Sequence, residues 1–159
     1  MLIREEKLLA ENYRQQLITK RKQGHKEGEL IVVGSNQNSF MVIVRESNFN
    51  PLDFSVILAY KMPNSNQNFR LRRYNGSSHE HTNKLEKDKM SFVFHIHMAT
   101  ERYQLAGWRE EAYAQPTTRY ADVNGAIDCL FKDCGFILPL SLQQKLPFEL
   151  EADWWTLKQ

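Results

Sequence analysis

Short apolar segments separated by polar turns constrain the fold of this chain most strongly. Four of them follow one another in the first half of the sequence, at residues 29–33, 40–45, 54–62 and 69–74. Their connections include GSNQNS and MPNSNQN, whose Gly, Asn, Ser and Pro residues are typical of turns. Strands that follow one another through connections this short pair antiparallel. The first two segments are apolar at nearly every position, which predicts central strands covered on both faces.

Helical patterns flank these segments. Residues 2–22 carry an apolar stripe typical of an amphipathic helix. Residues 122–134 form the clearer pattern, because Asp122 is a good N-cap and Gly135 a good helix stop. The apolar residues of this second helix recur at helical spacing: Val123, Ala126, Ile127, Leu130, Phe131 and Cys134. With further strands at residues 90–99 and 108–114, the sequence predicts an α+β fold: an antiparallel sheet of about five or six strands with an N-terminal and a C-terminal helix packed on it.

Composition narrows the class of protein. Hydrophobic residues make up 42% and charged residues 25% of the 159 residues, which is typical of one globular domain, and we place it at residues 1–159. No apolar run is long enough to cross a membrane, and the N-terminus is unlike a secretory signal. Cys129 and Cys134 are poorly spaced for a disulfide on one helix. These features together favour the cytoplasm.

Histidines concentrate in one part of the chain. Four of the five lie in two His-x-His pairs, His79/His81 and His95/His97. In a strand at residues 90–99, alternation puts His95 and His97 on one face and an apolar set on the other. The polar stretch between the pairs predicts a hairpin turn centred near Lys87, which would place His81 opposite His95 and His79 opposite His97.

Arginines flank the two histidine pairs and add cations that could hold a phosphate group. Arg70, Arg72, Arg73 and Arg102 lie just before and after the histidines, and residues 67–109 carry eight Lys or Arg against four Asp or Glu. Arg72, Arg73 and Arg102 are the predicted phosphate-binding residues. Cleavage of RNA through its own 2′-hydroxyl needs an acid, a base and cations that hold the phosphate, and this set supplies all three. RNA is the partner that this first interpretation predicts, with no metal cofactor.

Two other interpretations use the same histidines differently. Neutral imidazoles on one strand face can chelate zinc or another divalent transition metal, with His79, His81, His95 and His97 as the ligands. Alternatively the histidines are structural, and the protein is a non-catalytic module that acts by protein–protein contact. Residues 136–159 suit that last alternative, because Trp154 and Trp155 must bury against the chain's own sheet or against a partner, such as a second copy in a homodimer.

The segments FRLRRYNGSSHEHTN and FHIHMATERY, within residues 69–103, resemble the TumE-type toxin components of bacterial toxin–antitoxin modules. The matching positions are Arg73, Tyr74, Asn75, His79, His81, Asn83, His95 and His97. The resemblance implies a small cytoplasmic ribonuclease-like toxin paired with a DNA-binding antitoxin. Asn75 departs from the pattern, because those toxins often carry Asp at this position, and the departure removes a carboxylate from the site.

Overall fold

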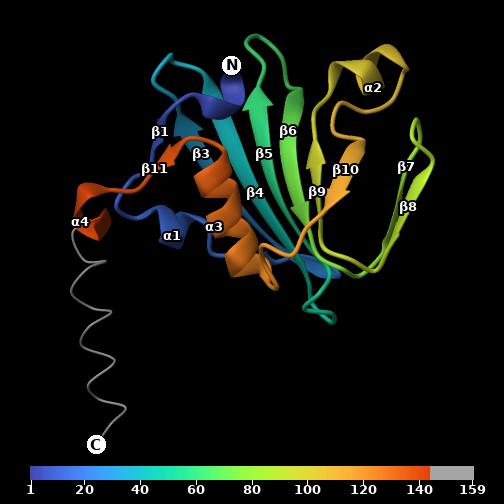
Figure 1. Cartoon of the computed structure of the whole chain (residues 1–159). Coiled ribbons are helices and arrows are strands. Elements are labelled where there is room, and N and C mark those ends of the chain that lie inside the picture. The colour runs from blue at the N-terminus through green and yellow to red at the C-terminus, as the bar shows by residue number, and fades with distance from the viewer. Residues whose placement is uncertain (144–159) are drawn as a thin grey trace, which may run out of the picture.

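One antiparallel sheet organises the molecule (Figure 1). The computed structural model describes residues 1–143. From edge to edge the seven strands are β10 (Tyr113–Pro116), β9 (His95–Met98), β6 (Asn68–Asn75), β5 (Phe54–Lys61), β4 (Ser39–Ser47), β3 (His25–Val33) and β2 (Lys20–Arg21). Every neighbouring pair is antiparallel. The α+β class with an antiparallel sheet is therefore confirmed, with seven strands instead of five or six, because two-residue β2 is too short to leave a sequence pattern.

Smaller elements complete the described part of the chain. Two short strands pair in parallel, β1 (Lys7–Leu8) and β11 (Phe136–Ile137), and a separate hairpin consists of β7 (Glu80–Asn83) and β8 (Asp88–Ser91). The helices are α1 (Tyr13–Gln16), α2 (Glu101–Leu105), α3 (Val123–Asp133) and α4 (Leu140–Gln143), preceded by a 3₁₀ turn at Leu2–Arg4. Trp154 and Trp155 lie outside the described residues.

The prediction of the second helix is confirmed by α3. The Asp122 carboxylate accepts a hydrogen bond from the backbone N–H of Gly125 at 2.8 Å, which caps the first turn. Gly135 follows the helix with a φ of 71°, a left-handed conformation that glycine adopts without strain. The stripe that includes Ala126, Leu130 and Cys134 is buried in the core shared with the sheet. Figure 1 shows α3 lying across one face of the sheet.

The predicted N-terminal helix over residues 2–22 is wrong. The stretch contains a 3₁₀ turn, β1, α1 and β2 instead of one continuous helix. Leu9, Tyr13 and Leu17 of the predicted stripe are buried in the core, so the apolar pattern was real. The chain bends because β1 pairs with β11, a contact between residues far apart in sequence that overrides local helix propensity.

The side chain of Lys7 holds the N-terminal segment against the end of α3. Its ammonium group is fully buried and donates hydrogen bonds to the carbonyl oxygens of Leu2 at 3.1 Å, Ile3 at 3.2 Å, Glu5 at 2.7 Å and Cys134 at 2.9 Å. It also lies 4.2 Å from the centre of the Phe40 ring. One cation therefore ties the N-terminal turn to the end of α3.

Replacing Lys7 with methionine is expected to lower the free energy of unfolding by about 2–4 kcal/mol, because buried carbonyl groups lose their donor while the apolar stem is retained. Urea denaturation checks this. Lys132 on α3 is exposed, and the matched Lys132→Met variant should change stability by less than about 0.5 kcal/mol. Equal stability of the two variants would contradict the assigned role of Lys7.

Strand register separates the two faces of the sheet. Val56, Tyr74 and Ile96 are cross-strand neighbours on the face that carries α3 and the core. On the opposite face, one row across the sheet runs Ser55, Asn75 and His95, and the next row runs Ile57, Arg73 and His97. The histidine strand thus faces away from α3. The prediction that both faces of the first strands are covered is wrong for β3, since Ile31 and Val33 are 54% and 55% exposed.

A bulge in β6 decides which arginines join the histidines. The pairing of β5 with β6 shifts between Leu58 and Ala59, so Leu58 pairs with Arg72 while Ala59 pairs with Arg70. The extra residue, Leu71, is buried in the core. Arg70 and Arg73, three residues apart, consequently share the histidine face, and Arg72 faces the core side with Leu58.

Candidate functional site

The β7–β8 hairpin is attached to the edge of the sheet by one asparagine. The Asn83 side chain accepts a hydrogen bond from the backbone N–H of Ala114 at 2.9 Å and donates one to the Ala114 carbonyl at 2.8 Å. These two bonds are the pair that a residue of a neighbouring strand would form with Ala114 at the open edge of β10. A second attachment lies at the hairpin turn, where the Tyr103 hydroxyl donates to the Glu86 carboxylate at 2.5 Å. These contacts hold the hairpin over β9.

The hairpin brings the two histidine pairs together, though not through the predicted register. His81 pairs with Met90 inside the hairpin and not with His95. The predicted strand at residues 90–99 is interrupted between β8 and β9, where Phe92 has a φ of 53°. The break lets the hairpin fold back over the sheet. His79 and His81 therefore reach His95 and His97 by packing across two sheets.

The four imidazoles form one cluster. Ring centres lie 4.6 Å apart for His81 and His97, 5.0 Å for His95 and His97, 5.1 Å for His79 and His95, and 5.6 Å for His81 and His95. The relative exposure of His95 is 0% and that of His97 is 2%, whereas His81 is half-buried and His79 is exposed. The sequence prediction that the four histidines converge agrees with the structure, and the burial of His95 and His97 was not foreseen.

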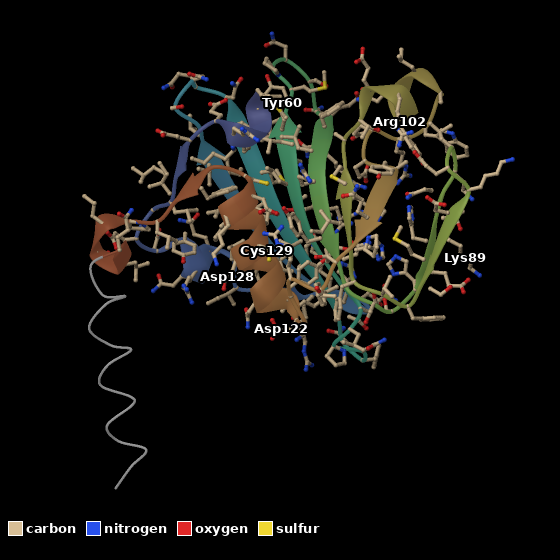
Figure 2. All side chains as sticks on the ribbon, viewed as in Figure 1. Tyr60, Lys89, Arg102, Asp122, Asp128 and Cys129 are labelled. Carbon is tan, nitrogen blue, oxygen red and sulfur yellow. The ribbon has the colours of Figure 1, made fainter. Side chains whose placement is uncertain are left out.

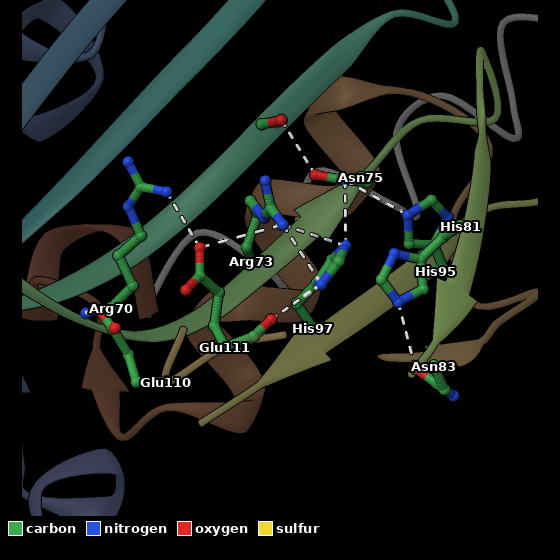
Figure 3. A network of polar contacts seen from close by, with 10 residues as sticks. Arg70, Arg73, Asn75, His81, Asn83, His95, His97, Glu110 and Glu111 are labelled. Atoms are coloured by element: carbon green, nitrogen blue, oxygen red, sulfur yellow. Dashed lines mark hydrogen bonds and ion pairs between the residues drawn. The ribbon is translucent and has the colours of Figure 1, made fainter. Parts of the chain in front are cut away.

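Hydrogen bonds fix the tautomers of the two buried rings. Figure 3 shows the bond of His97 to the Glu111 carbonyl and the contacts of both rings with Asn75. Nδ1–H of His95 donates to the carbonyl of Val93 at 2.8 Å, and Nδ1–H of His97 donates to the carbonyl of Glu111 at 2.9 Å. Each ring therefore keeps its lone pair on Nε2. Both Nε2 atoms lie 3.3 Å from the same amide nitrogen, Nδ2 of Asn75, whose oxygen accepts from the Ser55 hydroxyl at 2.9 Å.

His81 has the opposite tautomer. Its Nε2 lies 3.1 Å from Oδ1 of Asn83, an oxygen that already accepts from the Ala114 backbone, so Nε2 carries the proton. The lone pair of the neutral ring is then on Nδ1. Burial lowers the pKa of His81 below its usual value, more than its bond to Asn83 raises it. At neutral pH His81 is consequently a proton acceptor.

The buried histidines are held neutral more firmly. Burial lowers the pKa of His95 to about 4, with further lowering from the neighbouring histidines. Burial and the adjacent Arg73 guanidinium lower the pKa of His97 to about 2. Neither ring can supply a proton near pH 7, so both are expected to act as acceptors or as neutral packing groups.

Arg73 brings a cation into the cluster. Its Nη2 lies 3.3 Å from both ring nitrogens of His97 and 3.9 Å from the Glu111 carboxylate. Burial lowers the pKa of Arg73, Glu111 opposes the effect, and arginine remains protonated near neutral pH. Glu111 is itself 1% exposed and is bound at 3.0 Å by Arg70. The pair of arginines thus balances a buried carboxylate beside the histidines.

A surface pocket opens over this group. Its lining residues come from β6, β7 and the turn after it, β9 and the connection before β10: Arg73, Glu80, His81, Thr82, Lys84, His97, Trp108, Arg109, Glu111 and Ala112. Two of the predicted catalytic histidines, His81 and His97, are in this lining. His95 and His79, whose ring centres lie 5.1 Å apart, are not in the lining.

The three predicted phosphate-binding arginines are placed in different parts of the molecule. Arg73 is in the cluster, as described. Arg72 faces the α3 side, near enough to Asp133 to help lower the pKa of its carboxyl. Arg102 lies on α2, where it bridges Glu86 and sits 5.0 Å from the Tyr113 ring centre (Figure 2). Neither Arg72 nor Arg102 lines the pocket, so neither is in position to hold a phosphate there.

Sequence reasoning missed several residues of the site. Trp108, Arg109 and Glu111 line the pocket over the cluster, and no motif singles them out. Arg70 was recognised as a flanking cation, but its place on the histidine face was not. Strand alternation alone would put Arg70 with Arg72, because a bulge leaves no signal in one sequence. The connection before β10 carries no periodic pattern, so Glu111 was indistinguishable from a solvated residue.

Comparisons with known proteins add no relative: no protein-family model, no curated protein and no solved structure matches this chain. None of the helices in residues 1–143 is long and apolar enough to span a membrane. Within the same residues, no three His, Cys, Asp or Glu side chains are arranged as a metal-binding group.

Proposed function

We propose that the protein is a ribonuclease that cleaves RNA through the 2′-hydroxyl of its substrate. The observation that carries the proposal is the convergence of the histidines beside Arg73 in a surface pocket. A neutral imidazole with a free lone pair and a fixed guanidinium are the groups that this transesterification requires.

The reaction balances within the site. Nδ1 of His81 takes the proton of the 2′-hydroxyl, the 2′-oxygen attacks the adjacent phosphorus, and the bond to the 5′-oxygen breaks. His79, the exposed member of the cluster, is the candidate donor that protonates the leaving 5′-oxygen. The products are a 2′,3′-cyclic phosphate and a 5′-hydroxyl. The Arg73 guanidinium stabilises the extra negative charge on the phosphate oxygens.

The remaining residues hold this arrangement. Asn75 joins both Nε2 atoms of the buried pair, and the Tyr120 hydroxyl donates to the carbonyls of Asn75 at 2.9 Å and of His95 at 3.1 Å. His95 and His97 are therefore positioning residues, whose rings pack against the His81 ring and set its orientation. The assignment differs from the sequence-based hypothesis, in which all four histidines supply acid and base.

The biological role follows from the same proposal. We propose, on the resemblance of residues 69–103 to TumE-type toxins, that this ribonuclease is the toxin of a bacterial toxin–antitoxin or defence module with a DNA-binding antitoxin as its partner. Induced expression in bacteria tests the role. Wild-type protein is expected to arrest growth and degrade total RNA, and His79→Ala/His81→Ala at an equal soluble level is expected to do neither. Arrest that survives in the double variant would refute a histidine-dependent toxin.

A specific observation favours metal binding as a second candidate function. Both buried rings donate Nδ1–H to backbone carbonyls and direct Nε2 inward, and histidines that bind zinc are oriented in this way. A zinc or similar ion at these nitrogens would require Asn75 to give up its two contacts, and it would then supply a Lewis acid.

Elemental analysis of untagged protein decides between the two candidates. Metal binding predicts one equivalent of a transition metal in the wild type, and loss of that metal in His95→Gln/His97→Gln. Metal-free protein that cleaves RNA supports the first candidate and contradicts the second.

A further inference from the structure

We infer that the pocket over the histidine cluster is a nucleotide-binding subsite in which a base of single-stranded RNA stacks on Trp108. The inference rests on the proposed function, because it names the substrate contact made at that same site. It is carried by three independent features of the pocket: an exposed aromatic ring, an excess of positive charge, and unpartnered polar groups at its base.

Trp108 is an aromatic side chain exposed at a polar pocket. It is 46% exposed, although tryptophan is usually more buried than that in a folded domain. Its backbone is fixed: the N–H donates to the carbonyl of Tyr103 at 2.9 Å, and the preceding Gly107 has a φ of 79°. An exposed indole on a fixed backbone is suited to stacking on a nucleobase, an interaction that accepts any base because it does not read the base edge.

The charges of the pocket favour an anion. Glu80 is bridged to Lys89 at 2.9 Å and Glu111 to Arg70 at 3.0 Å, and both of these cations come from outside the lining residues. Lys84 and Arg109 line the pocket and form no ion pair with any of the described residues. With Arg73 they give the lining an excess of positive charge, as a phosphodiester requires.

The base of the pocket contains polar atoms without a partner. Within residues 1–143, Nε of Arg73 and Oε2 of Glu111 are buried and form no hydrogen bond. Buried polar groups of this kind are rare in native proteins, and where they occur they often belong to a functional site. Both belong to residues that line the pocket beside His97. The Arg73 guanidinium beside the pocket therefore keeps a donor that no residue within 1–143 uses.

Direct binding tests the inference without relying on cleavage. The probe is a fluorescently labelled 2′-O-methyl RNA hexamer, which has no free 2′-hydroxyl and cannot be cut by the proposed reaction. Its Kd is measured by anisotropy for the wild type, Trp108→Ala and Trp108→Phe. Loss of one stacking contact is expected to raise the Kd about 5- to 150-fold in Trp108→Ala, and Trp108→Phe should retain most of the affinity. The control is Phe49→Ala, because Phe49 is 87% exposed and lies outside the pocket lining.

Each outcome decides the inference. A Kd raised in Trp108→Ala but unchanged in Phe49→Ala supports it, even if native RNA is never cleaved, in which case the proposed ribonuclease alone fails. Equal Kd values for the wild type and Trp108→Ala overturn it, even if RNA is cleaved. Absence of binding by the wild type also overturns it. So does a competition experiment in which inorganic phosphate displaces the hexamer at the same concentration as a mononucleotide does, because the base would then contribute nothing to binding.

Discussion

Replacing His81 with glutamine is expected to lower the rate of RNA cleavage by about 100- to 10,000-fold, the usual contribution of a general base. Glutamine retains an amide that can still donate to Asn83, so the hairpin should keep its place on the edge of β10. The variant removes only the Nδ1 lone pair, which in the proposed reaction takes the 2′-hydroxyl proton. Single-turnover cleavage of a short RNA by purified protein measures the effect.

The fifth histidine provides the matched control. His25 is on β3, 3.8 Å from Glu27 and outside the cluster. His25→Gln is expected to cleave at the wild-type rate, and both variants should unfold at the same urea concentration as the wild type. A His81→Gln protein that is folded and retains more than about one tenth of the activity would show that His81 is not the base.

Mild acid is expected to destabilise the fold strongly through His95 and His97. In the unfolded chain both rings bind a proton near pH 6.5, whereas in the native protein their pKa values are lowered to about 4 and about 2. Below pH 6.5 the unfolded state therefore binds more protons, and stability falls as the pH falls. Each ring contributes up to about 1.4 kcal/mol per pH unit well below pH 6.5, and the two together about 3 kcal/mol between pH 6.5 and 5.

Urea denaturation at pH 7, 6 and 5 measures this dependence. The His95→Gln/His97→Gln variant has no ring to protonate and should lose much less stability over the same range. Its absolute stability at pH 7 does not affect the comparison, because only the slope with pH is interpreted. Equal slopes for the two proteins, or imidazole NMR signals from His95 and His97 that titrate near pH 6.5, would contradict the assigned burial.

Local sequence patterns correctly predicted the features that are set by strand alternation or by helix capping. Alternation in residues 95–98 puts His95 and His97 on one face, because successive side chains of a strand point to opposite faces. The capping residue Asp122 and Gly135 bound α3 almost to the residue, since capping and left-handed φ are properties of individual side chains. These signals are local, and tertiary contacts did not override them.

Elsewhere the sequence prediction was wrong because contacts between residues far apart in sequence determine the structure. The pairing of β1 with β11 and the burial of Lys7 break the expected N-terminal helix. The bulge at Leu71 moves Arg70 onto the face of Arg73, whereas Arg72 stays on the core side as alternation predicts. Histidine density and the flanking arginines therefore identified the cluster and Arg73. The face of Arg70 and the position of Glu111 depend on a bulge and on a connecting loop, which one sequence does not specify.

Cleavage of RNA by the purified, untagged protein in the presence of a metal chelator tests the central claim most directly. The substrates are a short single-stranded RNA and the same sequence made entirely of 2′-deoxynucleotides. The proposed chemistry predicts that the RNA is cut, that the new ends are a 2′,3′-cyclic phosphate and a 5′-hydroxyl, and that the deoxy substrate stays intact. Intact RNA, or equal cleavage of both substrates, would contradict the account of the histidine cluster as a metal-free ribonuclease site.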